Sequence, residues 1–221
     1  MSWNNNNRHH YNNNPYYNNQ YPQQQQQQQQ QFNQYNLPHY PSYPQNQPYM
    51  PNQEWLRSVF DKVDKDRSGQ ISANELQGAL SNGTWKPFNP ETVRLMIAMF
   101  DKDKTGSINF EEFSHLWRYV TDWLNCFRSF DRDNSGNIDP SELRQALTTF
   151  GYRFTDSFLQ ILMKRYDREG KGHVTFDDFI QLCVQLQSLT NAFRQFDTDM
   201  DGWIKISYEQ FLTMVLNIAL N

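Results

Sequence analysis

The sequence is poor in cysteine, in long apolar runs and, over its first quarter, in charge. Two cysteines in 221 residues, Cys126 and Cys183, cannot form a disulfide framework or a cysteine-based zinc site, so we expect buried thiols in a reducing compartment. The longest apolar candidate, residues 211–220, is interrupted by Thr213 and Asn217 and falls short of the roughly 20 residues that cross a bilayer. No secretory signal is recognisable, so we expect a cytoplasmic protein, with the nucleus and endomembranes as further locations.

Residues 1–53 are almost free of charge. Arg8 is the single charged side chain there, among 13 Asn, 14 Gln, 8 Tyr and 7 Pro, and residues 23–31 are nine consecutive glutamines. With so few aliphatic side chains, burial cannot offset the chain entropy lost on folding. We therefore predict a disordered tail over residues 1–53 and a folded region over residues 54–221. The tail is either a solubilising leader or a self-associating or partner-binding segment.

A twelve-residue acidic pattern occurs five times in the folded region. The five copies, called loops one to five, begin at Asp64, Asp101, Asp131, Asp167 and Asp197. Each has glycine at position six and an aliphatic residue at position eight, and apolar residues at helical spacing flank it. This is the pattern of the EF-hand, whose loop binds Ca²⁺ through oxygen atoms of positions 1, 3, 5, 7, 9 and 12. The sequence therefore predicts an all-α fold of five EF-hands.

The distances between the loops predict how the hands pair. Residues 76–100 leave room for two helices, whereas residues 113–130 and 179–196 each fit one helix shared by two loops. Loops one and two should therefore pair, as should loops three and four, each pair through a short antiparallel β bridge at position eight. The fifth loop has no partner within the chain. Together with the apolar helix expected over residues 211–220, it predicts a homodimer or heterodimer formed through the fifth EF-hand.

Three loops carry a full set of calcium ligands. Carboxylates at positions 1 and 3 supply charge, position 7 contributes its backbone carbonyl, and glutamate at position 12 binds with both oxygens. The expected ligands are Asp64, Asp66, Ser68, Gln70 and Glu75 in loop one, Asp131, Asp133, Ser135, Asn137 and Glu142 in loop three, and Asp101, Asp103, Thr105, Ser107 and Glu112 in loop two. We expect calcium in loops one and three, and we also expect loop two to be competent.

Loops four and five depart from this set. Loop four places the ammonium of Lys171 at position five, and its last residue, Asp178, is one methylene shorter than glutamate. We therefore expect loop four to be structural. Loop five offers Asp197, Asp199, Asp201 and the carbonyl of Trp203, but Tyr208 replaces the terminal carboxylate. We expect it to bind calcium weakly, or to hold Mg²⁺ instead, and to serve mainly in dimerisation.

Residues 54–221 resemble the penta-EF-hand family. The resemblance is carried by long stretches, which read VDKDRSGQIS, LSNGTWKPFNPETVR, YDREGKG followed by FDDFIQ, and FDTDMDGWIKISYEQF. Within the family, the chain is similar to the subgroup linked to programmed cell death. The peflin subgroup, which also has a low-complexity leader, is the competing assignment.

The resemblance implies a calcium-dependent adaptor. Such a protein is a helical dimer that exposes an aromatic cleft on calcium binding and captures Pro-rich segments of partners. Partners of the family act in ESCRT-linked trafficking, endoplasmic-reticulum exit and membrane repair, so peripheral, calcium-dependent membrane association is also expected. The family holds calcium at its first and third loops and usually has a defective second loop, from which Thr105 and Gly106 depart here.

The resemblance also implies which residues line the cleft. These are Trp85, Phe113, Trp117, Tyr119, Trp123, Phe150 and Tyr208. Aromatic residues at helical spacing usually pack in a core, and Phe113 has the position of a core residue. Trp117 and Trp123, however, lie among charged neighbours on the shared helix, which favours a groove suited to Pro-rich ligands.

Other functions fit the sequence less well. A calcium-regulated hydrolase would need a nucleophile paired with histidine, whereas the five histidines are scattered and no phosphate-binding glycine loop is present, so no enzymatic activity is expected. A net charge of −4 argues against nucleic-acid binding. The alternative that stays open is a calcium buffer or a regulatory subunit without a Pro-rich ligand.

Overall fold

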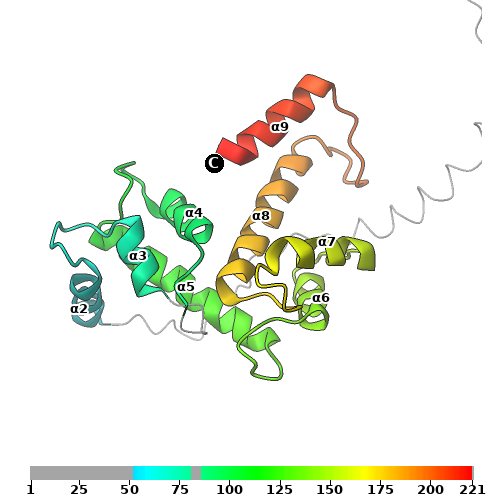
Figure 1. Cartoon of the computed structure of the whole chain (residues 1–221). Helices are drawn as coiled ribbons and strands as arrows, with labels where there is room; N and C mark the ends of the chain where they lie inside the picture. The colour runs from blue at the N-terminus through cyan, green and yellow to red at the C-terminus, as the bar shows by residue number, and fades with distance from the viewer. Residues whose placement is uncertain (1–51, 81–85, 221) are drawn as a thin grey trace, which may run out of the picture.

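The computed structural model describes residues 52–80 and 86–220, and Figure 1 shows their arrangement as two groups of helices followed by a last helix beside α8. The tail predicted over residues 1–53 falls almost wholly outside the described residues. The helices are α2 (Gln53–Val63), α3 (Ala73–Ala79), α4 (Pro90–Phe100), α5 (Phe110–Phe130), α6 (Pro140–Thr149), α7 (Asp156–Tyr166), α8 (Phe176–Arg194) and α9 (Tyr208–Leu220). The predicted all-α fold of EF-hands is confirmed.

Two isolated antiparallel bridges join the paired loops. Ile71 and Ile108 exchange backbone hydrogen bonds of 2.7 and 2.9 Å, and Ile138 and Val174 exchange two of 2.8 Å. All four side chains are fully buried. These residues occupy position eight of loops one to four, so the predicted pairing of loop one with two and of loop three with four is confirmed.

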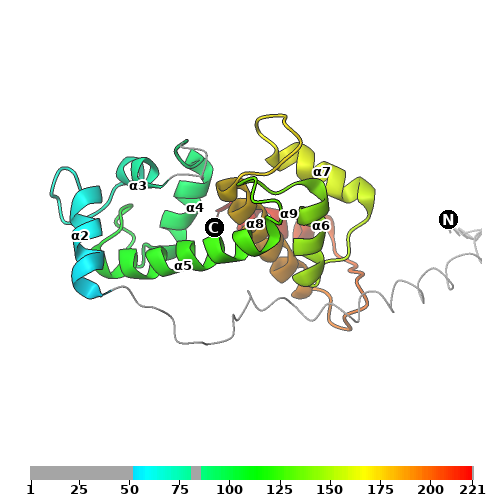
Figure 2. The ribbon, with the colours of Figure 1, turned by 90° about the horizontal axis from the view of Figure 1, so that it is seen from below.

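The two long helices are each shared by neighbouring hands. The 21 residues of α5 run from loop two to loop three, and the 19 residues of α8 run from loop four to loop five. Asn109 and Glu112 form a capping box at the start of α5, where each side chain accepts a hydrogen bond from the other residue's backbone N–H. Seen from below, α5 connects the two helix groups as a continuous rod (Figure 2).

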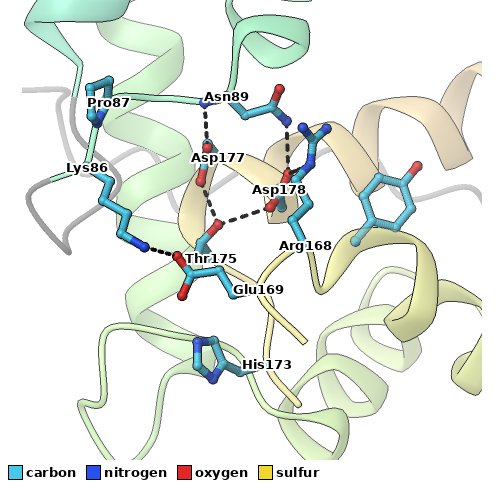
Figure 3. A pocket seen from close by; sticks show the side chains of 10 residues that line it. Lys86, Pro87, Asn89, Arg168, Glu169, His173, Thr175, Asp177 and Asp178 are labelled. Atoms are coloured by element: carbon cyan, nitrogen blue, oxygen red, sulfur yellow. Dashed lines mark hydrogen bonds and ion pairs between the residues drawn. The ribbon is translucent and has the colours of Figure 1, made fainter. Parts of the chain in front are cut away.

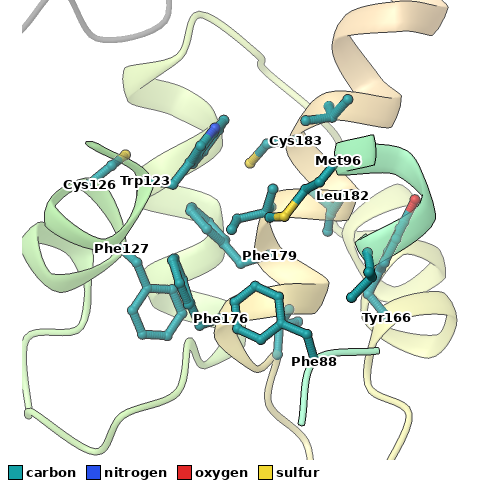
Figure 4. Packing of buried hydrophobic residues seen from close by; sticks show 14 of the residues in the cluster. Phe88, Met96, Trp123, Cys126, Phe127, Tyr166, Phe176, Phe179, Leu182 and Cys183 are labelled. Atoms are coloured by element: carbon teal, nitrogen blue, oxygen red, sulfur yellow. The ribbon is translucent and has the colours of Figure 1, made fainter. Parts of the chain in front are cut away.

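An aromatic core joins the two groups where α4, α5 and α8 meet (Figure 4). Phe176 of α8 lies 5.6 Å from Phe88 and 5.3 Å from Phe127, measured between ring centroids. Phe179, one turn further on, lies 5.9 Å from Trp123. Edge-to-face contacts of this kind add to the burial of large rings, so the two EF-hand pairs share one core.

Removing the centre of this core should destabilise both groups together. Phe179 is fully buried, so we expect Phe179→Ala to lower the free energy of unfolding by about 3–5 kcal/mol, through lost burial and the cavity left behind. Urea unfolding in chelator, followed by circular dichroism, measures the change. The control is Ile161→Ala on α7, because this side chain is 61% exposed and should change stability by about 0.5 kcal/mol or less. Equal effects of the two substitutions would contradict the proposed core.

Candidate metal centres

All five loops share one backbone shape. Position four has a left-handed backbone in each loop, with φ between 55° and 64°, and the glycine at position six has φ between 77° and 84°. The residues at position four are Arg67, Lys104, Asn134, Gly170 and Met200. This conformation is tolerated at some cost by side chains and without cost by glycine, which explains the glycine at position six. The resulting turn presents the backbone N–H groups of positions five and six to the first aspartate.

The first aspartate of each loop is held by those N–H groups. Asp64 accepts a hydrogen bond at Oδ1 from Ser68 N (3.0 Å) and another at Oδ2 from Gly69 N (2.8 Å). The equivalent pair of bonds holds the aspartate that opens each of the other four loops. The loop backbone therefore orients this carboxylate independently of an ion.

The glutamate at position 12 closes loops one, two and three. Glu75 accepts at Oε1 from Lys65 N (2.8 Å) and at Oε2 from Ser72 N (2.9 Å), and Glu112 and Glu142 accept equivalent bonds. Hydrogen bonds from the Ser72 hydroxyl and backbone lower the pKa of Glu75 to about 2. This carboxyl group therefore remains ionised, and available to a cation, far below neutral pH.

Carboxylate oxygens converge in four of the five loops. The groups are Asp64, Asp66 and Glu75, Asp101, Asp103 and Glu112, Asp131, Asp133 and Glu142, and Asp197, Asp199 and Asp201, with oxygen atoms within 4.8 Å of one another in each group. Three negative charges so close together repel unless a cation lies between them. Their oxygen chemistry suits a hard divalent ion such as Ca²⁺. Loop two has the same arrangement as loops one and three.

Loop four is organised differently. Its last residue, Asp178, accepts a hydrogen bond from the side chain of Asn89 in hand two (Figure 3). Asp178 also forms an ion pair with Arg168 Nε at 2.8 Å. Lys171 pairs with Glu169 within the loop. Within the described residues, loop four forms no group of three converging carboxylates. This geometry supports the prediction that loop four is structural.

Loop five is only partly organised as a metal site. Its three aspartates converge, and Asp201 accepts a hydrogen bond from Trp203 N at 2.7 Å. The residue at position 12, Tyr208, is 76% exposed. A terminal carboxylate is therefore missing, as the sequence predicts.

Known proteins match this chain over most of the described region. The family profile of an EF-hand domain pair matches residues 53–118 and 121–184, and an EF-hand profile matches residues 190–209. Sorcin from Schistosoma japonicum is 51% identical over 165 residues, which cover 75% of this chain and 96% of that protein. Peflin from Xenopus laevis is 49% identical over 158 residues, which cover 71% of this chain and 56% of peflin. The match thus spans little more than half of peflin's length.

A solved structure also matches. It is described as a homologue of programmed cell death 6 protein from Leishmania major Friedlin, and it covers 74% of this chain and 93% of its own, with 32% identity and a TM-score of 0.66. Five hands in register, two intrachain pairs and these relatives decide the assignment.

The chain belongs to the penta-EF-hand family.

As a penta-EF-hand protein, the chain is a calcium-binding protein, and Ca²⁺ is its cofactor. The convergent carboxylates of loops one to three fit this ion by charge and by oxygen chemistry. The subgroup within the family stays a prediction, because peflin, sorcin and a programmed cell death 6 homologue all match. Among the described residues, no helix is long and apolar enough to cross a membrane.

The structure distributes the expected cleft residues between core and surface. Trp85 lies outside the described residues. Phe113, Trp123 and Phe150 are buried, and Trp123 packs 6.5 Å from Phe150 and 5.9 Å from Phe179. Trp117 and Tyr119 are half-buried, and Tyr208 is exposed. The buried three fill space in the core of this structure. A cleft that all of these residues line after calcium binding stays a prediction.

Sequence reasoning missed two sets of contacts. The loop pattern assigns position seven a backbone carbonyl ligand alone, yet the hydroxyl of Ser107 donates to the side chain of Gln70 across loops one and two. The link from Asn89 to the end of loop four does not follow from the sequence either. The Asn89-Pro90 step signals a helix start in the sequence, but not the distant partner of its cap.

Loop two should bind one calcium ion. Glu112→Gln removes the charge of its bidentate ligand at nearly constant size, so we expect the calcium stoichiometry measured by titration calorimetry to fall by about one. The control is Glu111→Gln, an exposed neighbour in the same helical turn, which should leave the stoichiometry unchanged. An unchanged value for Glu112→Gln would show that intact ligands are not sufficient in this loop.

Loops one and three should provide the strong sites. We expect the double variant Glu75→Gln, Glu142→Gln to lose both of their sites from the sensor range of about 10⁻⁷–10⁻⁵ M, because each substitution removes a bidentate carboxylate. The further addition of Glu112→Gln isolates any contribution of loop five. Two surviving sensor-range sites in that triple variant would refute the ligand assignment.

Proposed function

We propose that the protein is a calcium-dependent adaptor that exposes aromatic surface on calcium binding and captures Pro-rich segments of partners. One observation carries the proposal: α5 has an expected calcium ligand at each end. Glu112 lies in its first turn, and Asp131, the first ligand of loop three, is its C-cap. A change in occupancy of either loop therefore acts on this helix.

The aromatic residues expected to meet a partner lie between those two ends. Trp117 and Tyr119 are half-buried on α5, and Trp117 makes an edge-to-face contact with the exposed Trp55 of α2 at 5.5 Å. Partly exposed indole rings suit proline rings, whose extended polyproline II conformation is already ordered before binding. Movement of α5 relative to α2 would change the surface that these rings offer.

The proposed assembly is a homodimer or heterodimer formed through the fifth EF-hand. Ile204 occupies position eight of loop five but has no bridge partner among the described residues, unlike its four counterparts. Among the described helices, α9 packs against α8 alone. Phe211, Val215 and Leu216 of α9 remain exposed, which favours burial against a second fifth hand.

A calcium buffer or a regulatory subunit without a Pro-rich ligand is the alternative. A buffer hand changes shape little on binding, whereas a sensor hand exposes apolar surface. Partners in vesicle trafficking or membrane repair, peripheral membrane association, a cytoplasmic or nuclear location and the absence of catalytic activity all belong to the proposal.

Peptide capture should require calcium and Trp117. The probe is a synthetic peptide of Tyr-Pro and Pro-Pro steps, titrated against the full chain by fluorescence polarisation. We expect binding in saturating calcium, loss in chelator, and at least tenfold weaker binding for Trp117→Ala because a stacking surface is removed. Ile161→Ala, on the exposed face of α7, is the control and should bind as the unmodified chain does. Calcium-independent binding of the peptide would contradict calcium-dependent capture. Absence of peptide binding, together with no calcium-dependent binding of an apolar dye, would favour the buffer.

Dimerisation should depend on the apolar face of α9. Leu216→Asp places a charge on a residue that is 56% exposed, so folding should be preserved while association is weakened by at least tenfold. Sedimentation velocity at micromolar concentration measures the change, and Ile161→Asp is the matched control on α7. A monomeric unmodified chain would refute the proposed interface.

A further inference from the structure

A buried polar cluster links the two EF-hand pairs at the start of α4. Asn89 N donates to Asp177 Oδ2 at 2.7 Å, and Asn89 Nδ2 donates to Asp178 Oδ1 and to Gln181 Oε1, each at 2.9 Å. These four side chains are buried, and Figure 3 shows Asn89 above the two aspartates. The carboxylates come from the last positions of loop four, whereas Asn89 is the N-cap of the first helix of hand two.

Arg168 of loop four completes the cluster. Its Nε pairs with Asp178 at 2.8 Å, and its Nη2 donates to Glu91 Oε2 and to Gln181 Oε1, each at 3.0 Å. Gln181 in turn donates to Glu91 Oε2 at 3.2 Å. We call each EF-hand pair a lobe, with hands one and two in the first lobe and hands three and four in the second. The cluster that joins them is called the interlobe latch, and its members are Asn89, Glu91, Arg168, Asp177, Asp178 and Gln181.

The latch uses carboxylates that a metal-binding loop would need for its ion. Burial raises the pKa of Asp178, and the charge of Asp177 raises it further, whereas Arg168 and the hydrogen bonds from Asn89 and Thr175 lower it. The ionised form of Asp178 therefore depends on Arg168 and Thr175 of its own loop and on Asn89 of the other EF-hand pair. In loop four, the guanidinium of Arg168 and the donors of Asn89 from hand two therefore take the place that a metal ion has in other loops.

Helix α4 connects the latch directly to loop two. It runs from Pro90, next to Asn89, to Phe100, and its C-cap is Asp101, the first ligand of loop two. An eleven-residue helix is a rigid rod of about 16 Å, so its orientation at the latch sets the position of Asp101. With the latch formed, Asp101, Asp103 and Glu112 converge within 4.8 Å.

We propose that the interlobe latch positions loop two for calcium, so that the affinity of loop two depends on a contact supplied by loop four. Asn89 is thus a positioning residue rather than a ligand. This inference rests on calcium binding by loop two, which belongs to the proposed function. It makes a non-binding hand a determinant of affinity in the opposite EF-hand pair.

Hand one supplies a matched reference. Asn52 caps α2 as Asn89 caps α4: its side chain accepts a hydrogen bond from Glu54 N at 3.1 Å, and the side chain of Asn89 accepts one from Glu91 N at 2.8 Å. Asn52 is exposed, whereas Asn89 is buried in the latch. The same substitution at both positions therefore separates helix capping from the latch.

The experiment compares Asn89→Asp with Asn52→Asp in the full chain. Aspartate caps helices as well as asparagine does, but at position 89 it removes both amide donors and places a carboxylate against Asp178. Calcium titration calorimetry is run on each chain with and without Glu112→Gln, and the difference isolates loop two. We expect Asn89→Asp to weaken loop two by at least tenfold, with loops one and three within about twofold, and Asn52→Asp to leave loop two unchanged.

Circular dichroism checks that each variant is folded, and a second variant tests the inference if Asn89→Asp does not fold. Glu91→Gln weakens the pairing with Arg168 at a partly exposed position, so it should fold and should weaken loop two by about two- to threefold. If Asn89→Asp does not fold, this variant decides the question, and unchanged affinity overturns the inference.

Other outcomes are equally decisive. Equal effects of Asn89→Asp and Asn52→Asp on loop two, or equal losses at loops one, two and three, overturn the latch as a positioning device. If Glu112→Gln has no effect in the unmodified background, loop two holds no calcium and the inference fails. The adaptor function then survives, because loops one and three and peptide capture are measured independently.

Discussion

Repulsion between closely spaced carboxylates is the constraint on which this structure depends. In loops one, two and three, three carboxylates with oxygens within 4.8 Å of one another meet at a site built by backbone N–H donors. Those donors orient the oxygens but do not cancel their charge, so a divalent cation is strongly favoured there. Loop four has the same backbone and a different solution: Arg168 and Lys171 neutralise Asp178 and Glu169. One loop shape therefore supports both a group of converging carboxylates and carboxylates paired with cationic side chains.

The long helices turn these local sites into a connected system. Glu112, for example, is an expected ligand, part of a capping box and a member of the first turn of α5. Asp131 is the C-cap of α5, so the helix begins and ends at expected calcium ligands. Its buried face packs through Trp123 and Phe127 against Phe179 and Phe176 of α8. Ion binding in either pair thus acts on a helix whose packing is shared by both.

The sequence predicts the hands, their pairing and the sharing of α5 and α8, because these depend on spacing along the chain. Position eight, for example, identifies Ile71 and Ile108 as bridge partners through loop register alone. The expected ligands converge in loops one to three for the same reason. The partner that a side chain contacts in the other EF-hand pair does not follow from spacing along the chain. Asp178 is identifiable as a poor ligand, but its partner Asn89 lies 89 residues away, and only the folded chain brings the two together.

The two hands least suited to calcium are those that contact, or offer a surface to, other parts of the assembly. Loop four pairs with loop three through Val174 and with hand two through Asp177 and Asp178. Loop five lacks a bridge partner in the described chain and precedes a helix with an exposed apolar face. In a hand that binds an ion, the carboxylates coordinate that ion. In a hand that binds none, the acidic and apolar groups can form contacts with other parts of the protein. Loss of the position-12 glutamate is therefore a gain of attachment sites, which is a physical reason for such hands to persist beside competent ones.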